Sequence, residues 1–253
     1  MKLNVTSETS RLKAVLLGTA YDIGGVPTPA LCYDPKSREH VCLGTFPSEQ
    51  DCIAEMNDLI KVFEKYNVMI FRPENIKGLN QIFSRDIALV VENKLILPNI
   101  IESRQKETEA IDAVLDIIAD SDKIVAPENV RLEGGDVILC NDYIFVGYSE
   151  YEDFEKYIVS RTNSAGLNFL AECFPEKKVK GLQLNKSDDN ARYNTLHLDC
   201  CFQPIGRDMA ILYEGGFKNK EDFIFLTNYF GRDNIIEISR EEAYNMNSNI
   251  FSI

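Results

Sequence analysis

The apolar and polar positions of this chain form one pattern that occurs three times. In each copy an acidic residue precedes two short apolar runs, and two polar residues join the runs. A two-residue polar link between β-rich runs predicts a tight hairpin. Recurrence of the acid at intervals of 50 and 63 residues predicts a fold of repeated units. The copies are Ser84-Arg85-Asp86, IALVV, Glu92-Asn93, KLIL; Glu133-Gly134-Gly135-Asp136, VILC, Asn141-Asp142, YIFVGY; and His197-Leu198-Asp199, CCFQPIG, Arg207-Asp208, MAILY.

A helical segment and one more strand are expected after each hairpin, so the repeated unit is hairpin, helix, strand. Before the first unit, Ser48 and Asp51 have the form of a capping box for a helix. Residues 19–47 have no period and are rich in Gly, Pro and Thr, which predicts a long loop. No linker divides the chain, so we expect a single domain over 1–253. The remaining expected helices are 104–119, 151–174 with a break near 161–163, and 219–230; the expected single strands are 13–18, 67–73, 123–127, 179–184 and 234–239.

The two ends of the pattern are incomplete. Strand 13–18 has no hairpin partner nearby, and after 234–239 the pattern calls for another hairpin. Asn247-Ser248-Asn249 stands where its loop is expected, and IFSI stands where its strand is expected to begin. Because exposed strand edges are normally covered, we expect that the domain lacks a C-terminal closing segment.

Composition narrows the class of protein. The 253 residues are 45% hydrophobic and 26% charged, which is typical of a globular protein with a full core. A net charge of −13 disfavours nucleic acid and anionic lipid as partners. There is no apolar stretch of membrane-spanning length and no secretory signal at the N-terminus. Seven cysteines without a CxxC pair favour buried thiols in a reducing, cytoplasmic compartment, and two histidines argue against a His-rich metal centre.

The acids that head the three units are the candidate chemistry. If the units close around an axis, Asp86, Glu133 and/or Asp136, and Asp199 converge on one place. We therefore expect an anionic pocket that contains His197. Taken singly, Asp86 and Asp136 also suit loop caps, and for Asp136, which follows two glycines, the structural interpretation is preferred. Arg161 alone is equally compatible with a solvated cation at the start of a helix.

Four motifs, in order, resemble those of the guanidino-group-modifying enzymes. They are SRD, EGGD, Arg161-Thr162-Asn163 before Gly166, and HLDCCF. This superfamily includes arginine deiminase, dimethylarginine dimethylaminohydrolase and arginine:glycine amidinotransferase. The resemblance extends from about Lys13 to Ile253. It implies an α/β fold of the pentein type, a five-bladed propeller of repeated ββαβ units, with the last unit incomplete in this chain.

The resemblance also implies roles for five residues. Asp86 and Asp199 resemble the pair that binds the substrate guanidinium, and His197 resembles the general acid/base. Glu133 resembles the carboxylate that orients the histidine. Arg161 resembles the arginine that binds the substrate α-carboxylate, although here EYEDFEKYIVS separates it from Gly147 and Ser149.

The superfamily also has a nucleophilic cysteine near its C-terminus, and no cysteine follows Cys201 here. The expected reaction is hydrolysis of the guanidino or ureido group of arginine or a derivative, through an amidino-thioether on a cysteine outside this chain. Strand geometry places His197 and Asp199 on one face, Cys200 on the other, and Cys201 about 13 Å away.

Two other functions stay open. An amine acceptor in place of water makes the same site an amidinotransferase, and a pentein scaffold can also be a non-catalytic binding protein. For the enzyme we expect no metal and no cofactor, a small cationic guanidino substrate, and an exposed blade edge that allows a homo-oligomer.

Overall fold

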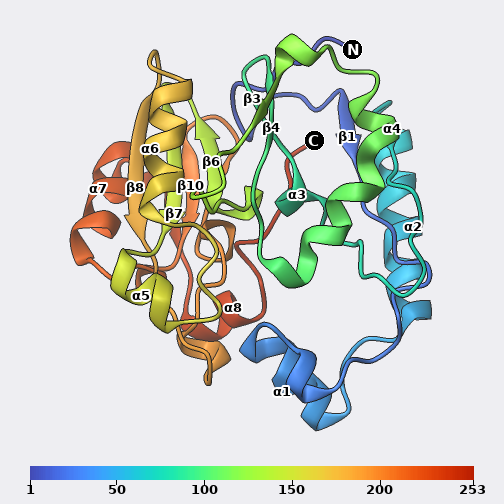
Figure 1. Ribbon diagram of the computed structural model, residues 1–253. Coiled ribbons are helices and arrows are strands. Elements are labelled where there is room, and N and C mark those ends of the chain that lie inside the picture. The colour runs from blue at the N-terminus through green and yellow to red at the C-terminus, as the bar shows by residue number, and fades with distance from the viewer.

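The chain is an α/β structure made of four small sheets with helices packed outside them (Figure 1). The computed structural model describes all residues, 1–253. Three sheets have three strands and one has two, in the orders β3-β4-β5, β6-β7-β8, β11-β10-β9 and β1-β2. The strands are β1 (Ala14–Leu16), β2 (Met69–Phe71), β3 (Leu89–Val91), β4 (Lys94–Leu97), β5 (Lys123–Val125), β6 (Val137–Cys140), β7 (Tyr143–Tyr148), β8 (Lys178–Gln183), β9 (Phe202–Ile205), β10 (Met209–Leu212) and β11 (Ile235–Glu237).

Each three-stranded sheet is an antiparallel hairpin with a parallel third strand, and helical chain connects the hairpin to that strand. The prediction of repeated ββαβ units is confirmed. The α-helices are α1 (Pro35–Leu43), α2 (Glu49–Lys65), α3 (Ser84–Ile87), α4 (Asp112–Leu115), α5 (Tyr151–Lys156), α6 (Ser164–Cys173), α7 (Lys220–Phe230) and α8 (Arg240–Tyr244). The 3₁₀ segments are η1 (Pro29–Leu31), η2 (Glu102–Ile111), η3 (Asp120–Asp122), η4 (Gly134–Asp136), η5 (Ala191–Tyr193), η6 (Leu198–Cys200), η7 (Glu214–Gly216) and η8 (Arg232–Asn234).

Two of the three hairpins have the predicted two-residue turn. Val91 pairs with Lys94, and Cys140 pairs with Tyr143. In the third hairpin Ile205 pairs with Met209, so three residues form the loop and the predicted two-residue link was wrong. The predicted break between α5 and α6 and the helix end at Gly231 are confirmed, as is the Ser48–Asp51 capping box.

The acid motifs are short helical turns and not parts of strands. The turns α3, η4 and η6 each lie directly before the first strand of a hairpin. Bonds between residues three apart satisfy their backbone, as from the Cys200 amide to the His197 carbonyl. The prediction that His197 and Asp199 share one face of a strand was therefore wrong.

Three other segments differ from the prediction. The segment 19–47 contains η1 and α1, whose N-terminus is capped by Asp34. The segment predicted as helix 104–119 is mostly the 3₁₀ segment η2, followed by one turn, α4. The predicted strand at IFSI does not form, because the chain continues from β11 into α8 and has no strand after it.

Strand β1 has one free edge. It pairs in parallel with β2 and has no antiparallel partner along its length, unlike β4, β7 and β10 at the centres of their sheets. The predicted closing segment and the predicted homo-oligomer both concern this edge, and both stay predictions.

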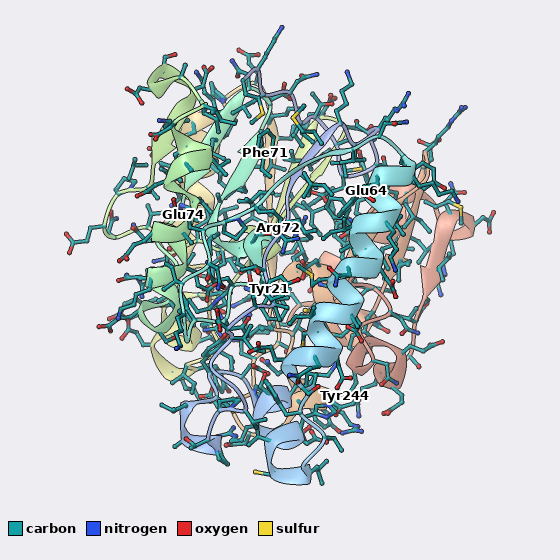
Figure 2. The ribbon with its side chains drawn as sticks, turned by 90° about the vertical axis from the view of Figure 1, so that its right-hand side faces the viewer. Tyr21, Glu64, Phe71, Arg72, Glu74 and Tyr244 are labelled. Atoms are coloured by element: carbon teal, nitrogen blue, oxygen red, sulfur yellow. The ribbon has the colours of Figure 1, made fainter.

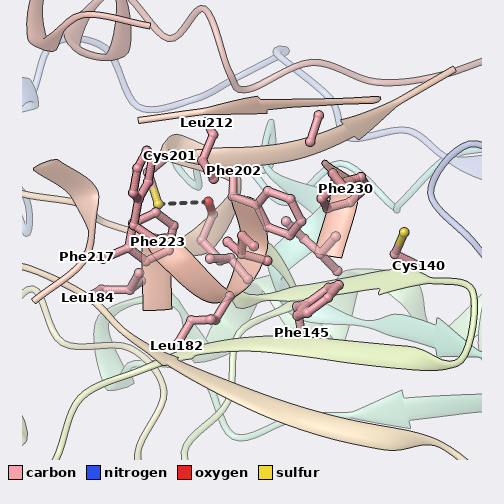
Figure 3. Packing of buried hydrophobic residues seen from close by; sticks show 14 residues of the cluster. Cys140, Phe145, Leu182, Leu184, Cys201, Phe202, Leu212, Phe217, Phe223 and Phe230 are labelled. Carbon is pink, nitrogen blue, oxygen red and sulfur yellow. Dashed lines mark hydrogen bonds between the residues drawn. The ribbon is translucent and has the colours of Figure 1, made fainter. Parts of the chain in front are cut away.

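The largest core cluster lies between the sheets of the second and third units (Figure 3). Phe145 of β7 belongs to this cluster and is fully buried. Its ring packs edge-on against Phe202 at 5.4 Å and stacks on Tyr143 at 5.2 Å. Such aromatic pairs bury a large apolar area, so this cluster fixes how the two sheets, and the polar turns at their ends, are placed.

We expect Phe145→Ala to lower the free energy of unfolding by about 3–5 kcal/mol, because the deletion leaves a cavity in a close-packed core. The matched control is Ile158→Ala, at a side chain that is 64% exposed, where the change should stay below about 0.5 kcal/mol. Urea unfolding measures both; equal effects would show that this cluster is not the core that joins the sheets.

Candidate active site

The three acid-bearing turns meet at the centre of the molecule. Turn η4 lies against both α3 and η6, and Figure 1 shows α3 in the middle of the ribbon, between the sheets. Because each turn precedes the first strand of its hairpin, equivalent ends of successive units face each other. The convergence expected from the repeat therefore occurs.

His197 is held between two carboxylates. Its Nε2 lies 2.8 Å from Oε2 of Glu133, and its Nδ1 lies 3.8 Å from Oδ1 of Asp86. All three residues are buried, and Glu133 has no exposed surface. Asp86 also accepts a hydrogen bond from the Gly135 amide at 3.1 Å. Glu133 thus fixes one ring nitrogen, and the other faces Asp86.

Two arginines contact the same carboxylates. Arg104 Nη1 lies 2.6 Å from Asp86 Oδ2 and 3.6 Å from Glu133 Oε2. Arg161 Nε lies 3.7 Å from Glu133 Oε2. Arg161 is therefore buried at the site, which contradicts the alternative of a solvated cation.

Asp199 has an arginine of its own. Arg85 Nε lies 3.1 Å from Asp199 Oδ2, although it is not aligned for a hydrogen bond. The same guanidinium lies 3.3 Å from Glu8 and donates to the Val137 carbonyl. It therefore joins the N-terminal segment to the site.

The site is close to electrically balanced, so the prediction of an anionic pocket was wrong. The sequence showed Asp86, Glu133, Asp136 and Asp199, but not the arginines that the fold brings to them. Arg104 is also bound in a bidentate manner by Glu107, with two contacts of 2.8 Å. Arg85, Arg104 and Glu107 were missed. Arg85 stands inside the SRD motif, but nothing in the sequence marks Arg104 or Glu107. Arg104 pairs with Asp86, 18 positions away, and with Glu133 of the next unit, and Glu107 pairs with Arg104.

Burial and pairing shift the acid–base behaviour of the site. Burial opposes protonation of His197, but the charges of Asp86, Glu133 and Asp136 outweigh it and raise its pKa to about 9. Burial alone raises the pKa of Glu133, yet its hydrogen bond to His197 and the nearby arginines lower it to about 2. Burial raises the pKa of Asp199 to about 6 against the effect of Arg85. At neutral pH the His197–Glu133 pair is an imidazolium and a carboxylate.

Six of the charged residues of the site line one cavity of about 1600 Å³. Those exposed to it are Arg85, Asp86, Arg104, Arg161, His197 and Asp199, whereas Glu133, Glu107 and Asp136 lie behind them. The segment 19–47 covers part of the cavity, since the Tyr33 carbonyl accepts a hydrogen bond of 2.9 Å from Arg161 Nη2.

Helix α1 of this segment is held against α8. Tyr244 lies below α2 and close to α1 in Figure 2, and its ring stacks on His40. The guanidinium carbon of Arg192 lies 4.0 Å from the centre of the same ring. Arg192 also pairs with Glu39 of α1 at 3.3 Å. These contacts hold the segment 19–47 in place over the cavity.

Asp86, Glu133 and His197 present ligand atoms within 4.8 Å of one another, as a metal site would. However, Arg104 contacts both carboxylates, so a divalent cation would have to bind beside a guanidinium. The donor set suits an organic cation with N–H donors better than a metal ion.

The two cysteines that follow Asp199 do not have the properties of an activated nucleophile. Cys200 lines the cavity, and its thiol lies 3.6 Å from Asp199 Oδ1. The prediction that Cys200 lies on the face opposite His197 and Asp199 was therefore wrong. Burial and the Asp199 charge raise the pKa of Cys200 well above its usual value. Cys201 is a core residue that donates to the Leu198 carbonyl (Figure 3). A thiol with a raised pKa is a poor nucleophile.

Residues 46–253 match the family described as "N,N dimethylarginine dimethylhydrolase, eukaryotic". The chain belongs to this family. Its relative in Bacillus subtilis (strain 168), the uncharacterized protein YkgA, is 25% identical over 197 residues. The match covers 77% of this chain and 61% of that protein.

Solved structures show the same fold. The N-terminal domain of ArgZ, a cyanobacterial arginine dihydrolase bound to substrate, superposes with a TM-score of 0.72 at 16% identity, over 95% of this chain and 80% of that one. DDAH from Pseudomonas aeruginosa, in complex with citrulline, superposes with a TM-score of 0.64 at 18% identity, over 92% of this chain and 78% of that one. The inosamine-phosphate amidinotransferase of Streptomyces griseus superposes with a TM-score of 0.68 at 15% identity, over 94% of this chain and 75% of that one. The fold is therefore of the pentein type, as predicted. None of the helices has the length and hydrophobicity needed to cross a bilayer.

We expect His197 to titrate near pH 9. The imidazolium is favoured in the folded state, so its stabilising effect is full below about pH 6.5 and is lost as the pH rises through 9. NMR of labelled imidazoles can follow this directly, because the chain has two histidines and His40→Gln assigns them. Glu133→Gln should lower the His197 pKa by at least about one pH unit; an ordinary pKa near 6.5 in the unmodified chain would refute the buried ion pair.

Proposed function

We propose that this chain supplies the substrate-binding and proton-transfer residues of a hydrolase acting on the guanidino group of arginine or an arginine derivative. The observation that carries the proposal is the buried His197–Glu133 pair, placed beside Asp86 and Asp199 in a cavity that Arg104 and Arg161 also line. Membership of the dimethylarginine dimethylhydrolase family supports it. So does likeness to folds whose solved examples hold a substrate or citrulline.

The charges of the site suit a zwitterion. In this structure Asp86 pairs with Arg104, and Asp199 pairs with Arg85. A ligand with both a guanidinium and a carboxylate can exchange partners with these pairs, its guanidinium taking Asp86 and Asp199 and its carboxylate taking Arg104 or Arg161. No buried charge is then left alone, and an unpaired buried charge costs about 3–5 kcal/mol. This refines the predicted cationic substrate to a guanidino amino acid.

His197 is the proposed proton carrier. With Nε2 bonded to the ionised Glu133, Nδ1 is the ring nitrogen that faces Asp86 and the cavity. When a thiolate attacks the guanidinium carbon, the imidazolium gives its proton to the departing amine as the C–N bond breaks. The neutral imidazole then takes a proton from water, which attacks the carbon of the amidino-thioether and releases the ureido product and the thiolate.

The thiolate belongs to a segment outside this chain in our proposal, because Cys200 and Cys201 are both held protonated. The proposed unit is thus a pentein-type catalytic domain that is completed by such a segment. Two alternatives use the same cavity: an amidinotransferase, in which an amine replaces water, and a non-catalytic binding protein.

Ligand affinity tests the site without turnover. We expect L-arginine to bind this chain, and Asp86→Asn or Asp199→Asn to weaken it by at least about tenfold through loss of charge-assisted hydrogen bonds. Agmatine, which lacks the carboxylate, should bind about tenfold more weakly than arginine. Calorimetry measures all of these, with the exposed Asp233→Asn as the matched control; equal affinity of the Asp86 variant would contradict the assignment.

Turnover tests the reaction. In the protein that contains this chain together with the segment carrying the nucleophile, Asp86→Ala, Asp199→Ala and His197→Ala should each reduce conversion of ¹³C-guanidino arginine by at least about 10²-fold. Cys200→Ser should retain most of the activity. Mass spectrometry distinguishes a ureido product from transfer to an added amine, which would favour the amidinotransferase. Unchanged turnover in the Asp86 and Asp199 variants would refute their roles.

A further inference from the structure

We propose that Lys186 and Asp136 are positioning residues that clamp the backbone on either side of His197 and thereby aim its ring at Glu133 and the cavity. The inference deepens the proposed function, since it rests on His197 being the proton carrier. Neither residue lines the cavity, so neither is placed to touch a substrate.

The backbone that carries His197 has no strand to hold it. Residues 194–196 lie between η5 and η6 and belong to no helix or strand. The His197 ring touches Glu133 at 2.8 Å, so a small shift of this backbone would break the contact. One backbone hydrogen bond holds this loop, from the Thr195 amide to the Asn185 carbonyl at 2.9 Å, and side chains supply the remaining contacts next to His197.

Lys186 fixes the residues before His197. Its Nζ donates to the carbonyls of Thr195 and Leu196, both at 2.8 Å. These are the two carbonyls that immediately precede His197. Burial lowers the pKa of Lys186 and the charge of Asp136 opposes that effect. Lys186 is half-buried, and an ammonium withdrawn from water needs hydrogen-bond partners, which here are the carbonyls of this loop.

Asp136 fixes the residue after His197. Its Oδ1 accepts a hydrogen bond of 3.0 Å from the Leu198 amide, and the side chain is completely buried. A Cβ on Gly147 would lie 2.6 Å from that Oδ1 and 2.9 Å from Leu198 Cβ, so this bond needs a glycine there. The Asp136 Oδ2 has no hydrogen-bond partner. Burying this carboxylate is costly, and the charges of His197 and Lys186 together with the bond from the Leu198 amide offset that cost.

The packing on the other side is equally tight. A Cβ on Gly135 would lie 2.8 Å from His197 Cγ and 2.9 Å from Asp86 Oδ1. The ring therefore cannot slide toward η4, and the clamp limits its movement in the other directions. The EGGD motif then has three distinct functions at one ring: Glu133 bonds it, Gly135 makes room for it, and Asp136 holds its backbone.

The sign of a pKa change separates a clamp from a mere charge effect. Removing the positive charge of Lys186 should, by electrostatics alone, raise the pKa of His197. If Lys186 instead holds the ring against Glu133, Lys186→Met should lower that pKa by at least about one pH unit, because the bond to the carboxylate is lost. NMR titration of the labelled imidazole reads this out, with the exposed Lys77→Met as control.

A pair of Asp136 variants provides a second test in case Lys186→Met does not fold. Asp136→Asn and Asp136→Leu remove the same charge and keep a side chain branched at Cγ, but only asparagine keeps an acceptor for the Leu198 amide. We expect the His197 pKa to be lower in the leucine variant by about one pH unit, with its Nε2 chemical shift no longer that of a bonded nitrogen. Equal His197 pKa values in Asp136→Asn and Asp136→Leu would contradict the proposed clamp. A raised or unchanged His197 pKa in Lys186→Met would contradict it as well.

This experiment does not depend on the reaction. If the pKa changes are as expected but His197→Ala leaves guanidino turnover intact in the completed protein, the clamp stands and the proposed function fails. If His197→Ala abolishes turnover and the pKa of His197 ignores both Lys186 and Asp136, the proposed function stands and the clamp fails.

Discussion

The contact between His197 and Glu133 is the interaction on which the rest of the site depends. A carboxylate without exposed surface must be paired, and it is paired here with an imidazolium at 2.8 Å. This pairing keeps the histidine charged at neutral pH and leaves its other ring nitrogen toward the cavity. Asp86, Arg104 and Arg161 then surround the pair, so that each buried charge has an opposite neighbour. In our proposal a ligand binds to this network by exchanging partners with the ion pairs that are already present.

The fold explains how so many charged residues can be buried in one place. The sheets of successive units bring their hydrophobic faces together in large clusters, and the turns before their first strands meet where those clusters end. Charged residues in these turns are thus buried by the surrounding structure and not by their own apolar neighbours. A second group, Glu107, Asp136 and Lys186, lies behind the cavity-facing residues and fixes them through hydrogen bonds.

The sequence was sufficient for the repeat, the fold type and the convergence of the acids, because these follow from local patterns and from motif order. It failed where an interaction joins distant residues. Arg104 reaches Asp86 across 18 positions, and Lys186 reaches Thr195 from a loop without regular structure. The sequence also failed at SRD and HLD, since a single helical turn before a strand has no periodicity to detect. The wrong prediction of an anionic pocket followed from this, because the acids stand in recognisable motifs and the arginines that balance their charges do not.

The most direct test of this account is a crystal structure of the chain with L-citrulline or L-arginine bound. We expect the guanidino or ureido group between Asp86 and Asp199, next to Nδ1 of His197, and the ligand carboxylate on Arg104 or Arg161. We also expect the contact between His197 and Glu133 to persist. A ligand bound away from His197, or an occupied cavity in which Asp86 and Asp199 keep their own arginines, would contradict it.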